Sequence, residues 1–281
     1  MTKIKIITDS ACDLDKSYLE ELDVHMVPMA VSFGQETFAD RVTITTNEFY
    51  KRLRTFPQLP NTSQITPIAY ESCFSEYVKQ GFHIICICFS SGLSGTYQSA
   101  CIARDLVGKD NIDVVDSKGA SVGFGLIVRQ AALMVKEGKN IREILDKVIY
   151  MRDRMEHLFI VGNLEMLKKG GRISTTQAAI GSIINVKPIL QFDDGKIIPF
   201  EKVRGEKAAI RKLLDTMKER GSHIENQVIG LNYSEDDRLC MKLKEEIEKN
   251  FGVKQFVVSE IGAAIGSYVG GGTTSVFFLR G

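Results

Sequence analysis

The sequence predicts an α/β protein made of two α/β domains. In the first half of the chain, short apolar runs typical of strands alternate with helical patterns, which indicates a mainly parallel sheet. In the second half a strong hairpin signal, Asp193-Asp194-Gly195, lies beside further strand–helix–strand units, which indicates a mixed sheet. The length of 281 residues suits about two domains. We place the boundary between residues 155 and 156 and expect a ligand pocket where the domains meet.

The expected first domain, residues 1–155, consists of alternating strands and helices whose polar caps separate apolar runs. Its strands are expected at Ile4–Thr8, along the extended run Val24–Phe33, at His83–Phe89 and at Ile112–Val115. Its helices are expected at Lys16–Leu22, Thr46–Phe56, Ile68–Gln80, Tyr97–Val107, Ala120–Glu137 and Ile141–Met155. The segment Leu59–Pro67 is enclosed by prolines and is expected to be a loop.

The expected second domain, residues 156–281, contains the hairpin and shorter strand–helix units. Its strands are expected at Leu158–Val161, Pro188–Phe192, Lys196–Val203, Gln227–Tyr233, Lys254–Ile261 and Thr274–Leu279. Its helices are expected at Thr176–Asn185, Lys207–Arg220 and Asp236–Phe251. The segment Gly266–Gly272 is rich in glycine and is expected to be a loop.

Composition argues against several classes of function. The 36 basic and 35 acidic side chains nearly cancel, which is not the charge profile of a protein that binds nucleic acid or a membrane surface. No apolar run reaches the length of a membrane span, and the first residues are typical of a strand rather than of a signal peptide. The six cysteines lack paired C-x-x-C spacing, so we expect reduced thiols in a cytoplasmic protein. For Cys86 and Cys88 we favour core packing over metal binding.

The segment Phe89–Thr96 is the most informative part of the chain. It joins an apolar strand to a helix through glycines and hydroxyl side chains, an arrangement that suits a small anion. Two other strands also end in polar turns, at Thr8-Asp9-Ser10 and Asp116-Ser117, and in a parallel sheet these turns share one edge. Asp9, Ser10 and Asp116 could equally serve only as helix caps.

Known catalytic motifs are mostly absent. The chain has no P-loop, no G-x-G-x-x-G after a strand, no H-E-x-x-H, and its four histidines are scattered. Gly92-Leu93-Ser94-Gly95 approaches the nucleophile elbow G-x-S-x-G, but its second glycine is displaced by one position. A serine hydrolase with Ser94 as nucleophile is therefore the enzyme alternative. The number of hydroxyls in these loops favours binding of a carboxylate or phosphate over attack on it.

Several motifs follow one another in an order that extends nearly from end to end of the chain. They are Thr8-Asp9-Ser10, Thr62-Ser63-Gln64 with Pro67, the segment from Ser90 to Ala100, Lys169-Gly170-Gly171-Arg172-Ile173-Ser174, Lys187-Pro188-Ile189-Leu190 before Asp194-Gly195, and Ile261-Gly262 with Gly266 and Gly270. On these motifs together, the chain resembles the DegV family of bacterial fatty-acid-binding proteins.

This resemblance implies a function as well as a fold. It implies a long-chain fatty acid held between the two domains, and a separate ATP-dependent fatty acid kinase that phosphorylates the bound carboxylate for phospholipid synthesis. By motif position, Thr62 and Ser94 would hold the carboxylate, with help from Ser63 and the Gly95 backbone. Arg172 could reach the head group or only hold the Gly170-Gly171 loop in place, and Arg204 is a candidate contact for the partner.

The acyl tail is expected in the second domain. Its candidate contacts are Ile180, Ile183, Ile184, Phe159 and Phe277. Near the C-terminus the family usually carries a histidine where this chain has Tyr268. Tyrosine can donate a hydrogen bond, but it cannot become a cation near neutral pH.

The sequence thus predicts a bacterial, cytoplasmic, non-enzymatic carrier of a fatty acid, with neither a cofactor nor a metal. A carrier for a different anionic small molecule remains open, because Tyr268 changes the expected head-group site.

Overall fold

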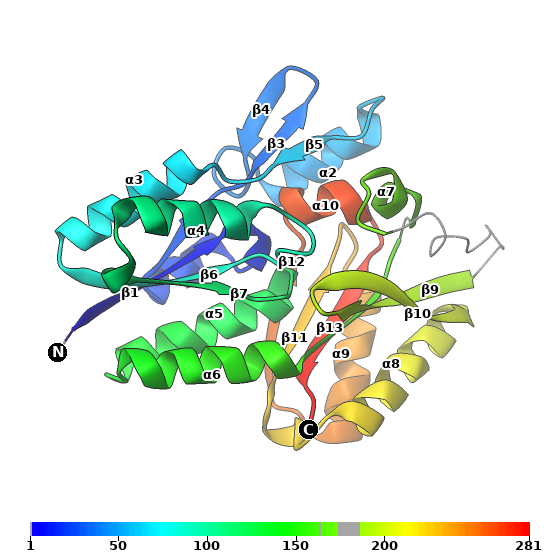
Figure 1. Ribbon diagram of the computed structural model, residues 1–281. Helices are drawn as coiled ribbons and strands as arrows, with labels where there is room; N and C mark the ends of the chain where they lie inside the picture. The colour runs from blue at the N-terminus through cyan, green and yellow to red at the C-terminus, as the bar shows by residue number, and fades with distance from the viewer. Residues whose placement is uncertain (1, 163, 174–185) are drawn as a thin grey trace.

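The computed structural model describes residues 2–162, 164–173 and 186–281, and its first half is built on a parallel four-stranded sheet (Figure 1). The strand order is β2-β1-β6-β7, and every pairing is parallel. The strands are β1 (Lys3–Asp9), β2 (Val24–Val27), β6 (Phe82–Cys88) and β7 (Ile112–Asp116). Since the chain returns by a helix or loop after each strand, the carboxyl ends of all four strands lie at one edge.

Helices cover both faces of this parallel sheet (Figure 1). α3 (Pro67–Lys79) and α4 (Thr96–Val107) pack on one face, and α5 (Ser121–Lys136) and α6 (Ile141–Arg154) lie on the other. The shorter elements near the start are η1 (Ser10–Cys12), α1 (Lys16–Glu21), α2 (Thr46–Thr55) and η2 (Lys109–Asn111). The helix expected from residue 46 is confirmed, and the hydroxyl of Thr45 caps it by accepting a hydrogen bond from the backbone N–H of Glu48.

A small antiparallel sheet, absent from the sequence prediction, projects from the first half. Its strand order is β4-β3-β5, with β3 (Ala30–Phe33), β4 (Glu36–Ala39) and β5 (Asn61–Ser63). The extended run Val24–Phe33 is thus two strands in two different sheets, because the chain leaves the parallel sheet after Val27. β5 lies inside the segment expected to be a loop, and its partner β3 holds Thr62 opposite Val31.

The second half is built on a mixed six-stranded sheet of order β10-β9-β8-β13-β11-β12. Its strands are β8 (Met155–Ile160), β9 (Val186–Asp193), β10 (Lys196–Arg204), β11 (Val228–Tyr233), β12 (Gln255–Glu260) and β13 (Thr274–Leu279). Only β11 and β12 pair in parallel. The predicted hairpin is confirmed: Asp194 and Gly195 both have positive φ, as a tight turn between twisted strands requires.

Helices α8 (Glu206–Arg220) and α9 (Arg238–Phe251) cover the outer face of the mixed sheet and enclose a second apolar core there. The inner face packs against α5, which contacts β8, β11, β12 and β13 as well as β1. α5 therefore lies between the two sheets, and its first half is buried all round, as its nearly continuous apolar sequence predicts. Gly123 allows the close approach, because a Cβ there would lie 2.5 Å from the ring of Phe277.

The segment expected to be a glycine-rich loop is largely helical. α10 (Ala263–Val269) covers most of it, and a turn at Gly270–Gly272 follows. The helix forms because Asp40, far away in sequence, accepts hydrogen bonds from the backbone N–H groups of Ala263 and Ala264 at 2.9 and 3.3 Å. Gly266 is needed inside it, since a Cβ there would lie 2.6 Å from the Phe49 ring. Local sequence carries neither of these tertiary contacts.

The expected fold class, a mainly parallel sheet followed by a mixed sheet, is confirmed. The strands of the first two sheets end at Asp116 and those of the third begin at Met155, while the proposed boundary between 1–155 and 156–281 stays a prediction. The expected helix Thr176–Asn185 lies outside the described residues, whereas the short α7 (Leu164–Lys169) and η3 (Ile224–Asn226) lie within them. Of the helices described, none is both long and apolar enough to cross a lipid bilayer.

We predict that Asp40→Ala lowers the free energy of unfolding by about 3 kcal/mol, because two buried N–H groups of α10 would lose their acceptor and Arg41 a neighbouring carboxylate. Urea unfolding at neutral pH measures the change. Asp105→Ala removes an exposed carboxylate paired with the side chains of Arg104 and Lys109 and should cost much less. Equal losses in the two variants would contradict the capping role of Asp40.

Candidate functional site

A cavity of about 210 Å³ lies between the carboxyl edge of the parallel sheet and the inner face of the mixed sheet. An engineered apolar cavity of about 150 Å³ holds a benzene ring, so this cavity is larger than a single ring requires. Most of its described lining is apolar, with contributions from both halves of the chain: Met29, Phe89, Leu93, Ala120, Phe159, Leu167, Phe192, Ile197, Ile261, Ala264, Ile265, Val269 and Phe277. Such walls suit an apolar ligand.

At one end of the cavity, hydroxyl groups from three distant segments meet. Thr62 on β5 and Tyr268 on α10 share a hydrogen bond of 2.6 Å between their hydroxyl oxygens. Ser94, in the turn before α4, also lines the cavity, and its hydroxyl lies 2.9 Å from that of Thr96. These three hydroxyls, with Arg172 nearby, form what we call the polar end of the cavity.

Arg172 brings a positive charge to the polar end. Its guanidinium lies 4.3 Å from the centre of the Tyr268 ring, and its Nε donates to the backbone carbonyl of Leu93 at 3.3 Å. It is the only charged side chain among the described residues that line the cavity. A cation beside hydroxyl donors, with no carboxylate on the same wall, favours an anionic ligand group there.

The turn before α4 has little free space at Gly95. A Cβ at this position would lie 1.9 Å from Oε1 of Gln64. Gln64 in turn donates to the Ser99 hydroxyl at 3.2 Å and so ties the segment after β5 to α4. Because residue 95 is a glycine, Gln64 can pack closely against the turn before α4, and Thr62 and Ser94 both line the same cavity. The order of the motifs in the sequence had suggested this proximity.

The polar turns at the carboxyl edge do meet, as expected, but their acids serve the backbone. Asp9 accepts hydrogen bonds from the N–H groups of Phe89 and Ala11 at 2.7 and 3.1 Å, and burial raises its pKa to about 7. Asp116 accepts from the Ser91 N–H at 3.1 Å. Neither acid lines the cavity. Their role at this edge is to align the loops.

A second polar group, which the sequence did not lead us to expect, lies inside the apolar wall. Asn232 on β11, Ser275 on β13 and Ser121 at the start of α5 all line the cavity, and all are buried. The available signal was the amide of Asn232 within the otherwise apolar strand Val228–Tyr233. Gln64, Leu167 and Phe192 are further lining residues that were not anticipated.

The expected site residues divide into three groups. Thr62, Ser94, Gly95, Arg172 and Tyr268 all line the one cavity, together with the tail candidates Phe159 and Phe277. The remaining candidates either lie elsewhere or cannot be placed. Ser63 is exposed and is not part of the lining, because it follows Thr62 on β5 and neighbouring strand residues point to opposite faces. Arg204 is exposed at the end of β10. The candidates that lie outside the described residues are Ile180, Ile183 and Ile184.

The hydrolase alternative gains no support from the surroundings of Ser94. The Ser94 hydroxyl contacts Thr96, and the imidazoles of the chain have other partners. His25 contacts Tyr77, His83 contacts Asp113, His157 contacts the Met155 carbonyl and His223 lies near Glu225. All six cysteines are free thiols, and within the described ranges no cluster of His, Cys, Asp and Glu could hold a metal ion.

Fold and site together define a class: an α/β protein with a parallel and a mixed sheet and an apolar cavity that has one polar, cationic end. The chain belongs to the DegV family. A family model described as "Uncharacterised protein, DegV family" matches residues 3–281. A DegV domain-containing protein of Caldanaerobacter subterraneus is 36% identical over 278 residues, 99% of each chain. Another, from Clostridium perfringens, is 39% identical over 286 residues, which cover 99% of this chain and 98% of that one.

Solved structures of the family have the same fold. A DegV-family protein from Thermus thermophilus, described by its fatty acid binding, superposes with a TM-score of 0.90 at 30% identity and 99% coverage of both chains. DegV from Bacillus subtilis, a fatty acid binding protein, gives 0.87 at 30% identity with full coverage of both. A stearic acid-binding protein from Eubacterium ventriosum gives 0.88 at 30% identity, with coverage of 99% of this chain and 98% of that one.

His157 lies beside the aromatic wall of the cavity, on the same face of the mixed sheet as Phe159 and Phe277. Its ring stacks on Phe192 at 4.7 Å and meets Phe277 edge-on at 5.3 Å. Nδ1 lies 3.1 Å from the Met155 carbonyl oxygen, and Nε2 has no partner among the described residues. Burial lowers the pKa of His157 from 6.5 to about 4, so the folded protein holds this ring neutral.

We predict that His157 lowers the free energy of unfolding of the protein in acid. Below pH 6.5 the unfolded chain protonates this residue while the folded protein does not, so stability falls as the pH drops from 6.5 to about 4. The loss approaches about 3 kcal/mol, at about 1.4 kcal/mol per pKa unit. His157→Gln should therefore show a flatter stability profile across this range in urea unfolding at several pH values.

The difference between the stability profiles of the parent protein and of His157→Gln reports on the imidazole of His157 alone. Burial raises the pKa of Asp9 to about 7 and that of Asp13 to about 6, which lowers stability as the pH rises through the same window. That opposing contribution is common to the parent protein and the variant, so it cancels in their difference. Parallel profiles would show that His157 does not titrate on unfolding.

Proposed function

We propose that the protein binds one long-chain fatty acid in this cavity and acts as a carrier rather than as an enzyme. The observation that carries the proposal is the cavity itself: an apolar space between the two sheets with hydroxyls and the Arg172 guanidinium at one end. A fatty acid has the same division into a long apolar tail and one anionic head. Family members of the same fold are described as fatty-acid-binding proteins, which supports the proposal further.

The head group is proposed to lie at the polar end. The hydroxyls of Thr62, Ser94 and Tyr268 are donors that suit a carboxylate, and the Arg172 guanidinium adds positive charge. The hydrogen bond between Thr62 and Tyr268 uses one of their two protons; with Tyr268 as its donor, the Thr62 hydroxyl keeps its own proton for the carboxylate. Tyr268 would thus act as a neutral donor where the resemblance led us to expect a histidine.

The tail is proposed to supply most of the affinity. Burial of an acyl chain contributes about 0.8 kcal/mol per CH₂ group, so about 16 carbons give on the order of 10 kcal/mol. Desolvation of the carboxylate costs several kcal/mol, which the hydroxyls and Arg172 need to offset. The head-group contacts therefore set orientation and oppose this cost, while the aromatic side chains Phe159, Phe192 and Phe277 contact the tail.

The accessibility of the two ends suits presentation to a partner. Thr62, Ser94, Arg172 and Tyr268 are each partly exposed, whereas Phe159 and Phe277 are 6% and 3% exposed. A carboxylate near the surface could be phosphorylated by a separate ATP-dependent fatty acid kinase in the cytoplasm, while the tail stays buried. We propose this kinase as the partner of the protein, with the exposed Arg204 as a candidate contact. The resulting acyl-phosphate would then be used for phospholipid synthesis.

We predict that the purified protein contains a fatty acid in about equimolar amount. Unfolding it, extracting with organic solvent and measuring the extract by mass spectrometry tests this and identifies the chain. The same loaded protein, given ATP and a fatty acid kinase catalytic subunit, should yield an acyl-phosphate that hydroxylamine traps. An extract without lipid, together with no uptake of added fatty acid, would sink the carrier proposal; binding without phosphorylation would remove only the kinase step.

We predict that Thr62→Ala and Ser94→Ala each weaken fatty acid binding about tenfold without abolishing it, because each removes one hydrogen bond to the head group while the tail contacts remain. Displacement of a fluorescent fatty acid measures the affinities. Ser63→Ala is the matched comparison, since Ser63 is the next residue of β5 and lies outside the cavity lining. Unchanged affinity in the Thr62→Ala/Ser94→Ala double variant would show that the head group binds elsewhere.

A further inference from the structure

The wall of the cavity that belongs to the mixed sheet has two polar side chains with unused hydrogen-bonding capacity. Asn232 on β11 and Ser275 on β13 are directly paired in the antiparallel register, and both line the cavity. They are only 1% and 4% exposed. Ser275 is paired on its other side with Phe159, so the polar pair continues into the aromatic wall.

The side-chain carbonyl oxygen of Asn232 has no hydrogen-bond partner among the described residues. A buried amide oxygen without a donor is unfavourable, and in native proteins such an atom calls for a partner. The Ser275 hydroxyl likewise has no hydrogen bond to another described side chain or backbone group, and it can donate as well as accept.

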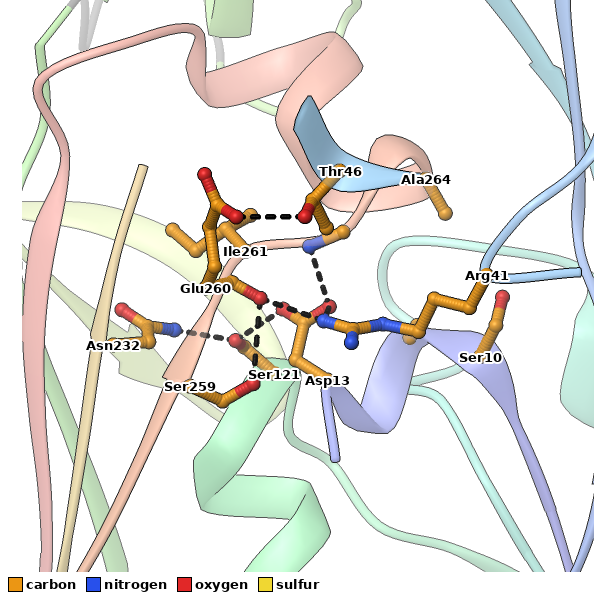
Figure 2. A network of polar contacts seen from close by, with 12 residues as sticks. Ser10, Asp13, Arg41, Thr46, Ser121, Asn232, Ser259, Glu260, Ile261 and Ala264 are labelled. Atoms are coloured by element: carbon orange, nitrogen blue, oxygen red, sulfur yellow. Dashed lines mark hydrogen bonds and ion pairs between the residues drawn. The ribbon is translucent and has the colours of Figure 1, made fainter. Parts of the chain in front are cut away.

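A chain of hydrogen bonds decides which end of the Asn232 amide is left without a partner (Figure 2). The carboxylate of Asp13 forms an ion pair with Arg41 at 3.1 Å and accepts the hydroxyl proton of Ser121. With its proton so used, Ser121 Oγ can only accept from Asn232, and the amide nitrogen supplies that donor. The amide oxygen is therefore the end of Asn232 that stays free.

A free acceptor beside a hydroxyl selects the chemistry of its occupant. Asn232 Oδ1 needs a donor, and the Ser275 hydroxyl can donate back to the occupant's oxygen. A hydroxyl group satisfies both at once, since it is a donor and an acceptor. An ammonium group fits poorly, because the described lining contains no carboxylate and already includes Arg172.

We propose that Asn232 and Ser275 form a subsite for a hydroxyl group on the ligand, so that the cavity prefers a hydroxylated acyl chain to its unsubstituted parent. The inference rests on the proposed function, because it assumes an acyl chain in the cavity. A water molecule could satisfy the same two side chains, and it would give no such preference. The experiment must therefore compare ligands.

The test measures displacement of a fluorescent fatty acid by stearic acid and by monohydroxystearic acids with the hydroxyl at successive positions. At least one positional isomer should bind the parent protein about tenfold more tightly than stearic acid does. The preference is read in each variant as the ratio of the two affinities, and it should disappear in Asn232→Leu, which keeps the approximate volume of the side chain. The preference should decrease in Ser275→Ala.

Asn250→Leu is the matched control, because it makes the same chemical change on the exposed face of α9, where the Asn250 side chain donates hydrogen bonds to Glu246. It should keep the full preference. Circular dichroism and thermal melting establish that each variant is folded. If Asn232→Leu fails to fold, Ser275→Ala decides the question through the same ratio of affinities.

The outcomes separate this inference from the proposed function. No isomer that binds more tightly than stearic acid, or a preference that survives both substitutions, overturns the subsite. Tight binding of stearic acid in that case leaves the carrier function intact. Binding of a hydroxylated acid without binding of stearic acid supports the subsite and narrows the carrier to hydroxylated chains. Binding of neither acid overturns both.

Discussion

The buried charge cluster of Asp13, Asp40 and Arg41 is the interaction on which the site depends. The Arg41 side chain is 8% exposed, and its guanidinium contacts Asp13 and the Glu260 carbonyl oxygen at 3.1 and 2.6 Å (Figure 2). Burial opposes the charge on Arg41, yet Asp13 and Asp40 raise its pKa above the ordinary value. Buried charges persist only when they are paired and hydrogen-bonded, so this cluster tolerates little movement.

This cluster connects the two halves of the chain at the segment that precedes α10. Asp13 accepts from the Gly262 N–H at 2.8 Å, while Asp40 caps the next two residues. Tyr50 adds a hydrogen bond of 3.0 Å to the Ile261 carbonyl. The orientation of α10 thus follows from buried acids on the first half, and α10 carries Tyr268 to the polar end of the cavity. The same Asp13 carboxylate fixes Ser121 and, through it, Asn232.

The cavity forms because α5 packs against both sheets and separates them. The helix fills the space between them, and Gly123 brings it against Phe277. Beyond the start of the helix at Ser121, residues of α10 and of the turn before α4 line the remaining space between the sheets. Apolar strands then supply the walls, and the glycine- and hydroxyl-rich turns supply one polar end. This division is what makes the site suit an amphiphile.

Local sequence determined the alternation of strands and helices, the Asp194-Gly195 hairpin and the polar turn around Ser94, because periodicity and turn chemistry are properties of neighbouring residues. The order of the motifs indicated the DegV family, and that resemblance indicated Thr62, Ser94 and Arg172 as candidate head-group residues. Only the tertiary structure decided that β5 pairs with β3, that Gly266 lies in a helix capped by Asp40, and that Ser63 lies outside the cavity lining while Thr62 lines it. It also decided that Asn232 keeps an unpaired oxygen beside Ser275. These features arise from contacts between residues distant in the chain, and no local pattern encodes which distant partner a hydrogen-bonding group will meet.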